Sequence, residues 1–256
     1  MLYYEHLKKL RKGGMKMQVY ISNKEIEDIA EGLVRTVYNQ RLPKQIDIDA
    51  VAGYLGISVI YEQIAEDDMD KIGFASNGRT PLKVRRNGMI QQTVYPKDTI
   101  VLDTFLLRPE EQHRRRFTEG HEIAHILLNR ADPFTNAACF NRVYDPERAY
   151  SLEELRDRMM LGESQANVMA AYLLMPRSLL EAAVNSHFHR KKVPVYGNCV
   201  FLPEMKPSLQ TMADELGVSH TAMLIQLRKY DLLEQRDMNE YFQKTRLSGG
   251  TSDGHR

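Results

Sequence analysis

The sequence has little cysteine, little net charge and no long apolar run, and each shortage excludes a class of protein. Its two cysteines, Cys139 and Cys199, form no CxxC pair, which argues against a disulfide framework and a thiolate zinc site. Lys plus Arg number 35 and Asp plus Glu 34, so a formal charge of +1 gives no overall attraction to nucleic acid or anionic membranes. The longest nearly uncharged stretches, such as 168–176, fall far short of the roughly 20 residues that cross a bilayer.

The 256 residues, of which 43% are hydrophobic, suffice for one large core or two smaller ones. The basic N-terminal stretch 1–16 is followed by no apolar run that could serve as the core of a signal peptide. We therefore expect residues 1–21 to be a flexible lead-in. We also expect a cytoplasmic protein that has no membrane partner, since its few cysteines suit a reducing compartment.

The N-terminal part of the chain shows two helical patterns and then a strand. Ser22 and Glu25 have the spacing of a capping box, and apolar residues then recur at helical intervals to about Gln40. Residues 47–55 form a shorter helical pattern that Gly56 ends. The β-rich segment 57–61 follows and is expected to pair into a sheet.

Residues 71–103 change to short β segments. They are separated by Asn77-Gly78 and Asn87-Gly88, dipeptides that favour the left-handed conformations of tight hairpin turns. A small, mostly antiparallel sheet is therefore expected, with 99–102 as its last strand before the next helix.

Two long helices are expected in the middle of the chain. One begins at Pro109, which is tolerated in the first helical turn, and runs to about Asn129. The other has capping-box spacing at its start and covers 151–176, and the segment between the two, 131–150, is expected to be a loop. Overall we expect an α+β fold with a first domain over 22–185, a helical domain over 186–247 and a disordered tail over 248–256.

The helix expected over 109–129 contains the pentapeptide His121-Glu122-Ile123-Ala124-His125, an HExxH motif. Residues four positions apart lie one turn apart on the same face, so both imidazoles can reach one metal ion. Glu122 then lies beside the metal rather than on it, where a general base must be to take a proton from the attacking water. The apolar neighbours of these residues indicate a buried segment.

A catalytic zinc site needs a third protein ligand. Leu128 and Ala131 stand where a metzincin would have Gly and His, so that ligand must come from farther along the chain. We choose Glu163, on a helix whose inward face would include small residues, with Asn167 one turn later as a hydrogen-bond partner of a ligand. Spacing alone leaves four alternatives open: Glu153, Asp157, His187 and His189.

Three blocks of sequence resemble the ImmA/IrrE family of bacterial and phage metallopeptidases. They are Phe117-Thr118 with the HExxH motif, Glu163-Ser164-Gln165-Ala166-Asn167, and Ala170-Ala171-Tyr172-Leu173-Leu174-Met175-Pro176. The resemblance implies a zincin-like metallopeptidase core and makes Glu163 the third zinc ligand. Glu119 and Gly120 depart from the pattern, because the family more often has an apolar residue and Ala there.

On this interpretation one catalytic Zn2+ ion is held by His121, His125 and Glu163, and Glu122 is the general base. The developing oxyanion of the transition state needs a further donor besides the metal. The candidates for that donor are Tyr144, Tyr150 and His187.

The segment 209–227 predicts a helix, a turn at Gly217 and a second helix capped by Ser219, which is a helix-turn-helix pattern. It could present His220, Thr221 and Gln226 to a DNA groove. However, residues 186–247 contain nine Lys plus Arg and seven Asp plus Glu, and a net charge of 9 − 7 = +2 is too weak to imply duplex binding. We therefore expect no direct DNA contact and keep DNA binding as the alternative.

The first functional hypothesis is a zinc endopeptidase that cuts a protein substrate. The resemblance implies a regulatory substrate, a helix-turn-helix repressor of a phage, mobile element or stress response, whose cleavage releases transcription. The second hypothesis is a non-catalytic regulator that binds DNA or a repressor and whose metal site is structural. A third, a component of a toxin–antitoxin pair, shares the same fold.

Overall fold

A computed structural model describes residues 21–68, 70–131, 139–142 and 161–248. The chain divides into two compact units, Met1–Pro176 and Arg177–Arg256. The first unit contains, in chain order, α2 (Asn23–Val37), α3 (Ile48–Tyr54), β1 (Ser58–Glu62), β2 (Lys71–Ala75), β3 (Leu82–Arg86), β4 (Met89–Thr93), β5 (Thr99–Asp103), the 3-10 turns η1 (Thr104–Leu107) and η2 (Pro109–Glu111), α4 (Gln112–Ala131), β6 (Cys139–Arg142) and α6 (Leu161–Leu174).

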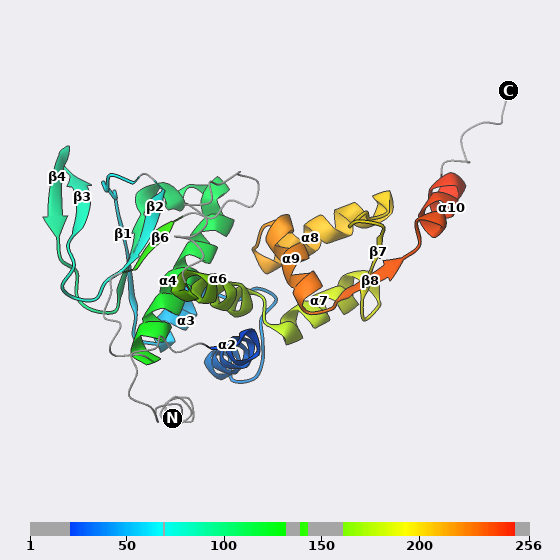
Figure 1. The fold of residues 1–256 in the computed structure, drawn as a ribbon, viewed down its shortest axis with the longest axis horizontal. Coiled ribbons are helices and arrows are strands. Elements are labelled where there is room, and N and C mark those ends of the chain that lie inside the picture. The colour runs from blue at the N-terminus through cyan, green and yellow to red at the C-terminus, as the bar shows by residue number, and fades with distance from the viewer. Residues whose placement is uncertain (1–20, 69, 132–138, 143–160, 249–256) are drawn as a thin grey trace. The chain divides into compact units, whose positions relative to one another are not determined.

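The core of the first unit is a four-stranded sheet in the order β1-β5-β2-β6. β1 runs parallel to β5, whereas β2 is antiparallel to both β5 and β6. The helix α4 packs on β2, β5 and β6, α6 packs on α4, and α2 packs on α6 (Figure 1). The order of layers is therefore sheet, α4, α6 and α2, so that α4 is buried on two sides. The fold is α+β and its sheet is mostly antiparallel, as expected.

The hairpin β3–β4 covers the opposite face of this sheet. Residues alternate between the two faces of a strand, so Phe74 and Gly73 of β2 point in opposite directions. Phe74 and Val101 form a buried cluster with Leu82, Val84 and Tyr95. Because the hairpin supplies part of that cluster, apolar packing fixes it to the sheet, while its own ladder joins β3 to β4.

Local signals account for most helix boundaries. Ser22 and Glu25 form the expected capping box at the start of α2, with Glu25 N donating to Ser22 Oγ. Asp47 caps α3, and Gly56 follows that helix in a left-handed conformation with φ of 68°. α4 begins after Pro109 as expected. The capping-box spacing expected at 151–154 lies outside the described residues.

Two expectations in this unit are wrong. Asn77-Gly78 does not close a hairpin, because β2 pairs with β5 and β6 rather than with β3. Instead, Asn77 Oδ1 accepts hydrogen bonds from the backbone of Arg79 and Thr80, a side-chain turn that competes with a hairpin turn. The segment expected to be a loop contains β6, an edge strand held by backbone pairing with β2.

The second unit contains α7 (Arg177–Phe188), β7 (Val193–Tyr196), η3 (Pro203–Met205), α8 (Lys206–Leu216), α9 (His220–Lys229), β8 (Leu233–Arg236) and α10 (Met238–Ser248). The helix-turn-helix is confirmed: Gly217 is left-handed and Ser219 Oγ accepts from Ala222 N at the start of α9. The units divide before Arg177 rather than after 185, because α7 packs on α8.

We expect Phe74→Ala to destabilise the first unit by about 3–5 kcal/mol, because Phe74 is fully buried in the cluster that joins hairpin and sheet. Urea unfolding measures this change. Met89→Ala is the matched control, since Met89 is 70% exposed on β4 and its loss should change stability by no more than about 0.5 kcal/mol. Equal effects of the two substitutions would contradict the packing described.

Candidate metal centre and active site

The two histidines of the HExxH motif lie on the part of α4 that is buried between the sheet and α6. His121 and His125 are 1% and 3% exposed. Ile123 and Ala124 fill the core on the neighbouring face of the helix and are fully buried. The helix therefore presents two imidazoles one turn apart at a fixed depth in the molecule.

Glu163, in the first turn of α6, brings a carboxylate to these imidazoles. Its Oε2 lies 3.2 Å from His121 Nε2, and its Oε1 lies 3.3 Å from His125 Nε2. Ligand atoms of the three residues all lie within 4.8 Å of one another. α6 can approach α4 this closely because the positions where they meet are small: a Cβ built on Gly120 would lie 3.6 Å from the Cβ of Ala170.

Asn167 sets the tautomer of His121. Asn167 Oδ1 lies 3.0 Å from His121 Nδ1, and since a carbonyl oxygen only accepts, that nitrogen carries the hydrogen. In neutral His121 the lone pair then resides on Nε2, which lies 2.8 Å from His125 Nε2. A lone pair and a carboxylate therefore face the same point, an arrangement that is favourable when a proton or a metal ion lies between them.

The protonation states suit metal ligation. Burial lowers the pKa of His121, so this imidazole stays neutral. Burial on its own would raise the pKa of Glu163, but the contacts of its carboxyl group with the imidazoles of His121 and His125 outweigh it and hold the pKa below its usual value. Metal ions bind neutral imidazole and ionised carboxylate, so neither group has to change its charge on binding.

Each imidazole has a carboxylate oxygen of Glu163 at a distance that suits neighbouring ligands of a zinc ion, although the oxygen differs: Oε2 lies near His121 and Oε1 near His125. Bonds of 2.0–2.1 Å place neighbouring ligand atoms about 3.3 Å apart, close to both carboxylate–imidazole distances. The two Nε2 atoms are closer, at 2.8 Å, so the rings have to separate by about half an ångström to admit the ion. Two imidazoles and one carboxylate are also a donor set that zinc commonly takes in catalytic sites.

Glu122 is fully buried beside His121. Its carboxyl group lies against β2 at Gly73, where a built Cβ would lie 2.7 Å from Glu122 Oε1. The side chain of the expected base thus lies between the helix that carries the histidines and the central strand of the sheet.

A comparison with protein families matches residues 52–228 to a peptidase family described as the IrrE N-terminal-like domain. The match covers more than half of the chain. The chain belongs to the IrrE N-terminal-like family. This match confirms the resemblance that the three sequence blocks indicate, and the family is one of metallopeptidases. In this structure His121, His125 and Glu163 form a group that could hold a metal ion. No curated protein matches the chain.

The other candidates for the third ligand and for the oxyanion donor are not found at the His121–His125–Glu163 group in the described residues. Tyr144, Tyr150, Glu153 and Asp157 lie outside the described residues. His187 and His189 belong to the second unit, where His187 Nε2 lies 3.3 Å from Glu215 Oε2. Among the candidates for the third ligand that the structure describes, Glu163 is the one it brings to the histidine pair.

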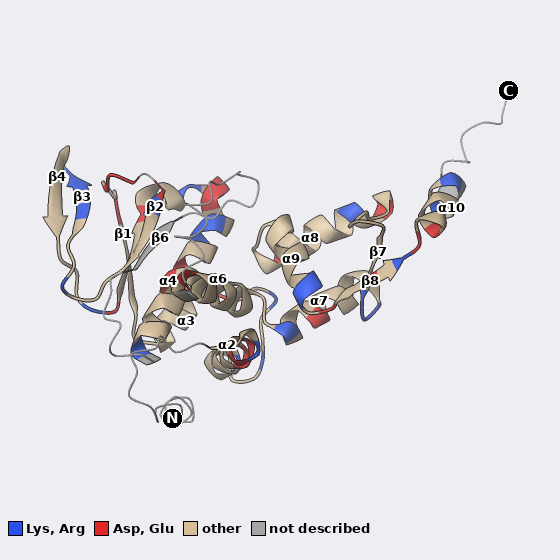
Figure 2. Ribbon diagram, viewed as in Figure 1, with Lys and Arg blue, Asp and Glu red and all other residues tan. Residues whose placement is uncertain are grey.

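The helix-turn-helix of this IrrE N-terminal-like chain gives little support to DNA contact. Gln226, one of the three residues that the alternative of DNA binding would present to a groove, is 1% exposed and does not suit that role. Its position places it on the inner side of α9 with Met223 and Leu227, which are fully buried. Few Lys and Arg lie on α8 and α9, and acids lie among them (Figure 2). In the described residues, no helix combines the length and apolar character needed to span a membrane.

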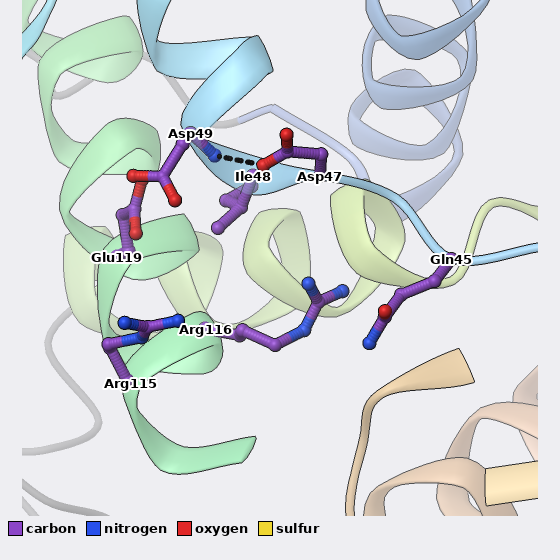
Figure 3. Close-up of a pocket in the computed structure, with 7 residues that line it drawn as sticks. All are labelled: Gln45, Asp47, Ile48, Asp49, Arg115, Arg116 and Glu119. Atoms are coloured by element: carbon purple, nitrogen blue, oxygen red, sulfur yellow. Dashed lines mark hydrogen bonds between the residues drawn. The ribbon is translucent and has the colours of Figure 1, made fainter. Parts of the chain in front are cut away.

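Sequence reasoning missed a polar cavity on a different face of α4. Glu119 lines this cavity of about 280 Å³ together with Arg115 and Arg116 of the same helix (Figure 3). The other lining residues come from the segment before α3 and from its first turn: Gln45, Asp47, Ile48 and Asp49. Burial and the neighbouring charge of Asp49 raise the pKa of Glu119 to about 8. The signal in the sequence was the departure at Glu119 from the family pattern, but spacing alone gives no partner for it.

We expect Glu119 to make stability depend on pH. Its pKa is about 8 in the folded protein and near 4.5 when unfolded, so the folded state binds the proton more tightly. The stabilisation is complete below about pH 4.5 and is lost as pH rises through 8, by an amount on the order of a few kcal/mol.

Urea unfolding of wild type and Glu119→Gln at pH 5, 7 and 9, with a chelator to remove any bound metal, measures the difference. Glutamine does not titrate, so the variant should gain stability relative to wild type as pH rises. A difference that stays constant over this range would contradict the pKa shift.

Proposed function

We propose that this chain is a cytoplasmic zinc-dependent endopeptidase that cuts a regulatory protein at a specific site. The observation that carries the proposal is the convergence of His121 Nε2, His125 Nε2 and the Glu163 carboxylate, with the fully buried Glu122 next to His121 in the sequence. Membership of a peptidase family supports the reaction type. The donor set of two imidazoles and one carboxylate favours zinc over Mg2+ or Ca2+, which prefer oxygen ligands.

In the proposed site His121, His125 and Glu163 are the ligands, and Asn167 keeps His121 in the tautomer that offers Nε2. A bound zinc ion supplies positive charge that polarises a peptide carbonyl and makes water more acidic. Glu122 accepts the proton from the attacking water and returns it to the leaving amine. The transition state is also expected to use a donor from the chain, for which Tyr144, Tyr150 and His187 remain the candidates.

The proposed substrate is a helix-turn-helix repressor, as the family resemblance implies. Cleavage of such a repressor would release transcription of the genes that it controls. The second unit, which itself contains a helix-turn-helix, gives little support to DNA binding, because Gln226 is buried and the net charge is small. We therefore propose a protein partner and no direct contact with DNA.

The non-catalytic alternative is a regulator with a structural metal site, and it gives Glu122 no role. A structural site needs ligands but no base, so it gives no reason to bury a carboxyl group next to the first ligand at a cost in desolvation. The fully buried Glu122 favours the peptidase.

We expect Glu122→Gln to lower kcat/KM by about 10²- to 10⁴-fold and to leave zinc affinity unchanged within a few-fold, since it removes the base and no ligand. The substrate for this test is the helix-turn-helix repressor encoded nearest to the gene, and the cut is mapped by mass spectrometry. Glu110→Gln, an exposed carboxyl near the start of α4, is the matched control and should cut like wild type.

Two outcomes would count against the proposal. Equal cleavage by wild type and Glu122→Gln would remove Glu122 from the mechanism. If the zinc-loaded wild type cut neither this repressor nor any member of a random peptide library, the peptidase proposal itself would fail.

We expect Asn167→Ala to weaken zinc binding by about 10- to 100-fold, because His121 loses the acceptor that fixes its tautomer and orientation. Competition with a chromophoric chelator measures the affinity. Asn185→Ala on the exposed side of α7 is the control. Unchanged affinity in Asn167→Ala would show that His121 is oriented by other contacts.

A further inference from the structure

Gly73 is at the centre of the sheet, on the strand that faces the HExxH helix. It pairs with Leu102 of β5 on one side and with Asn141 of β6 on the other. It lies on the face of β2 toward α4, opposite to the face on which Phe74 packs. Its φ lies outside the left-handed region, so the backbone conformation alone would accept a larger residue.

The reason for glycine at this position is steric. A Cβ at position 73 would lie 2.7 Å from Oε1 of Glu122 and 2.8 Å from Cγ2 of Thr118, and both distances are shorter than Cβ contacts in proteins allow. Gly120 provides a comparison on α4 itself, because a Cβ there would make ordinary contacts of 3.6 Å with Ala170. The sheet and the helix therefore leave no space for a side chain at position 73, where the carboxyl group of Glu122 lies.

A methyl group at position 73 would displace the neighbouring side chains more easily than the backbone of the helix or the strand. The atom that it meets first is the end of the Glu122 side chain, which can rotate at lower cost than the helix can move. Glu122 is fully buried, however, so its carboxyl group has no room to swing into solvent. The expected result of Gly73→Ala is a fold that persists with the Glu122 carboxyl group displaced from its place against β2.

We propose that Gly73 is a positioning residue, whose missing side chain leaves the notch in β2 that holds the Glu122 carboxyl group in its working position. This inference rests on the proposed function, in which Glu122 is the general base. Displacing a reacting group by about 1 Å can lower the rate by up to about 100-fold, so adding one methyl group at position 73 would strongly reduce catalysis.

The first test measures the contact without activity. Urea midpoints of the metal-free protein, in the presence of a chelator, are compared for wild type, Gly73→Ala, Glu122→Ala and the double variant. Gly73→Ala should lower the midpoint in the wild-type background and lower it less in the Glu122→Ala background, where Oε1 and Cδ are gone. The same decrease in both backgrounds would overturn the proposal.

The second test separates positioning from general damage to the site. With the repressor as substrate, Gly73→Ala should lower kcat by roughly 10- to 100-fold at unchanged KM, while the visible spectrum of the Co2+-loaded protein stays that of wild type. Gly32→Ala on α2 is the control and should keep the kcat of wild type, since a Cβ there meets nothing within 4 Å. A changed Co2+ spectrum would mean that the ligands themselves move, and an unchanged kcat would mean that Glu122 needs no notch; either result overturns the proposal.

The contact with Thr118 is removed by a third variant. If Gly73→Ala/Thr118→Ala recovered the kcat of wild type, the effect would pass through helix packing and not through Glu122, and the proposal would fail. We expect no recovery. Should the wild type cut no substrate at all, the proposed function fails, whereas the urea comparison still decides whether Gly73 and Glu122 are coupled.

Discussion

The approach of Glu163 to the paired Nε2 atoms of His121 and His125 is the interaction on which the rest of this molecule depends. It joins two helices that are far apart in the sequence, and it places one carboxyl group against two buried imidazole rings. Small residues where α4 meets α6 allow it, because larger side chains would hold the two helices apart. The site is thus a consequence of helix packing.

The other side of α4 imposes a second constraint. There the sheet must come close enough to support the helix yet leave space for a buried carboxyl group, and a strand position without a side chain meets both needs. The hairpin β3–β4 has no part in the site itself, but it seals the far face of the same sheet through Phe74 and its neighbours. Catalytic geometry and core packing therefore share β2, and a substitution on this strand can alter both.

Local patterns in the sequence were enough to predict α2, α3, α4, α8 and α9 and to select both histidines as candidate ligands, because caps and helical spacing act within a few residues. Glu163 needed more: spacing left four alternatives, and the similarity of a whole block to a family selected it. Gly73 could not be predicted, since its role depends on a contact with Glu122 across a strand and a helix. β6 was missed for a related reason, because an edge strand is defined by its pairing with β2 rather than by its own pattern.

X-ray absorption at the zinc edge of the zinc-loaded protein tests the central claim most directly. The account predicts a four-coordinate ion with only nitrogen and oxygen neighbours at about 2.0–2.2 Å and the outer-shell scattering of two imidazoles. Scattering from sulfur at about 2.3 Å, which would implicate Cys139 or Cys199, or a spectrum without imidazole features, would contradict the assignment of His121, His125 and Glu163 as ligands.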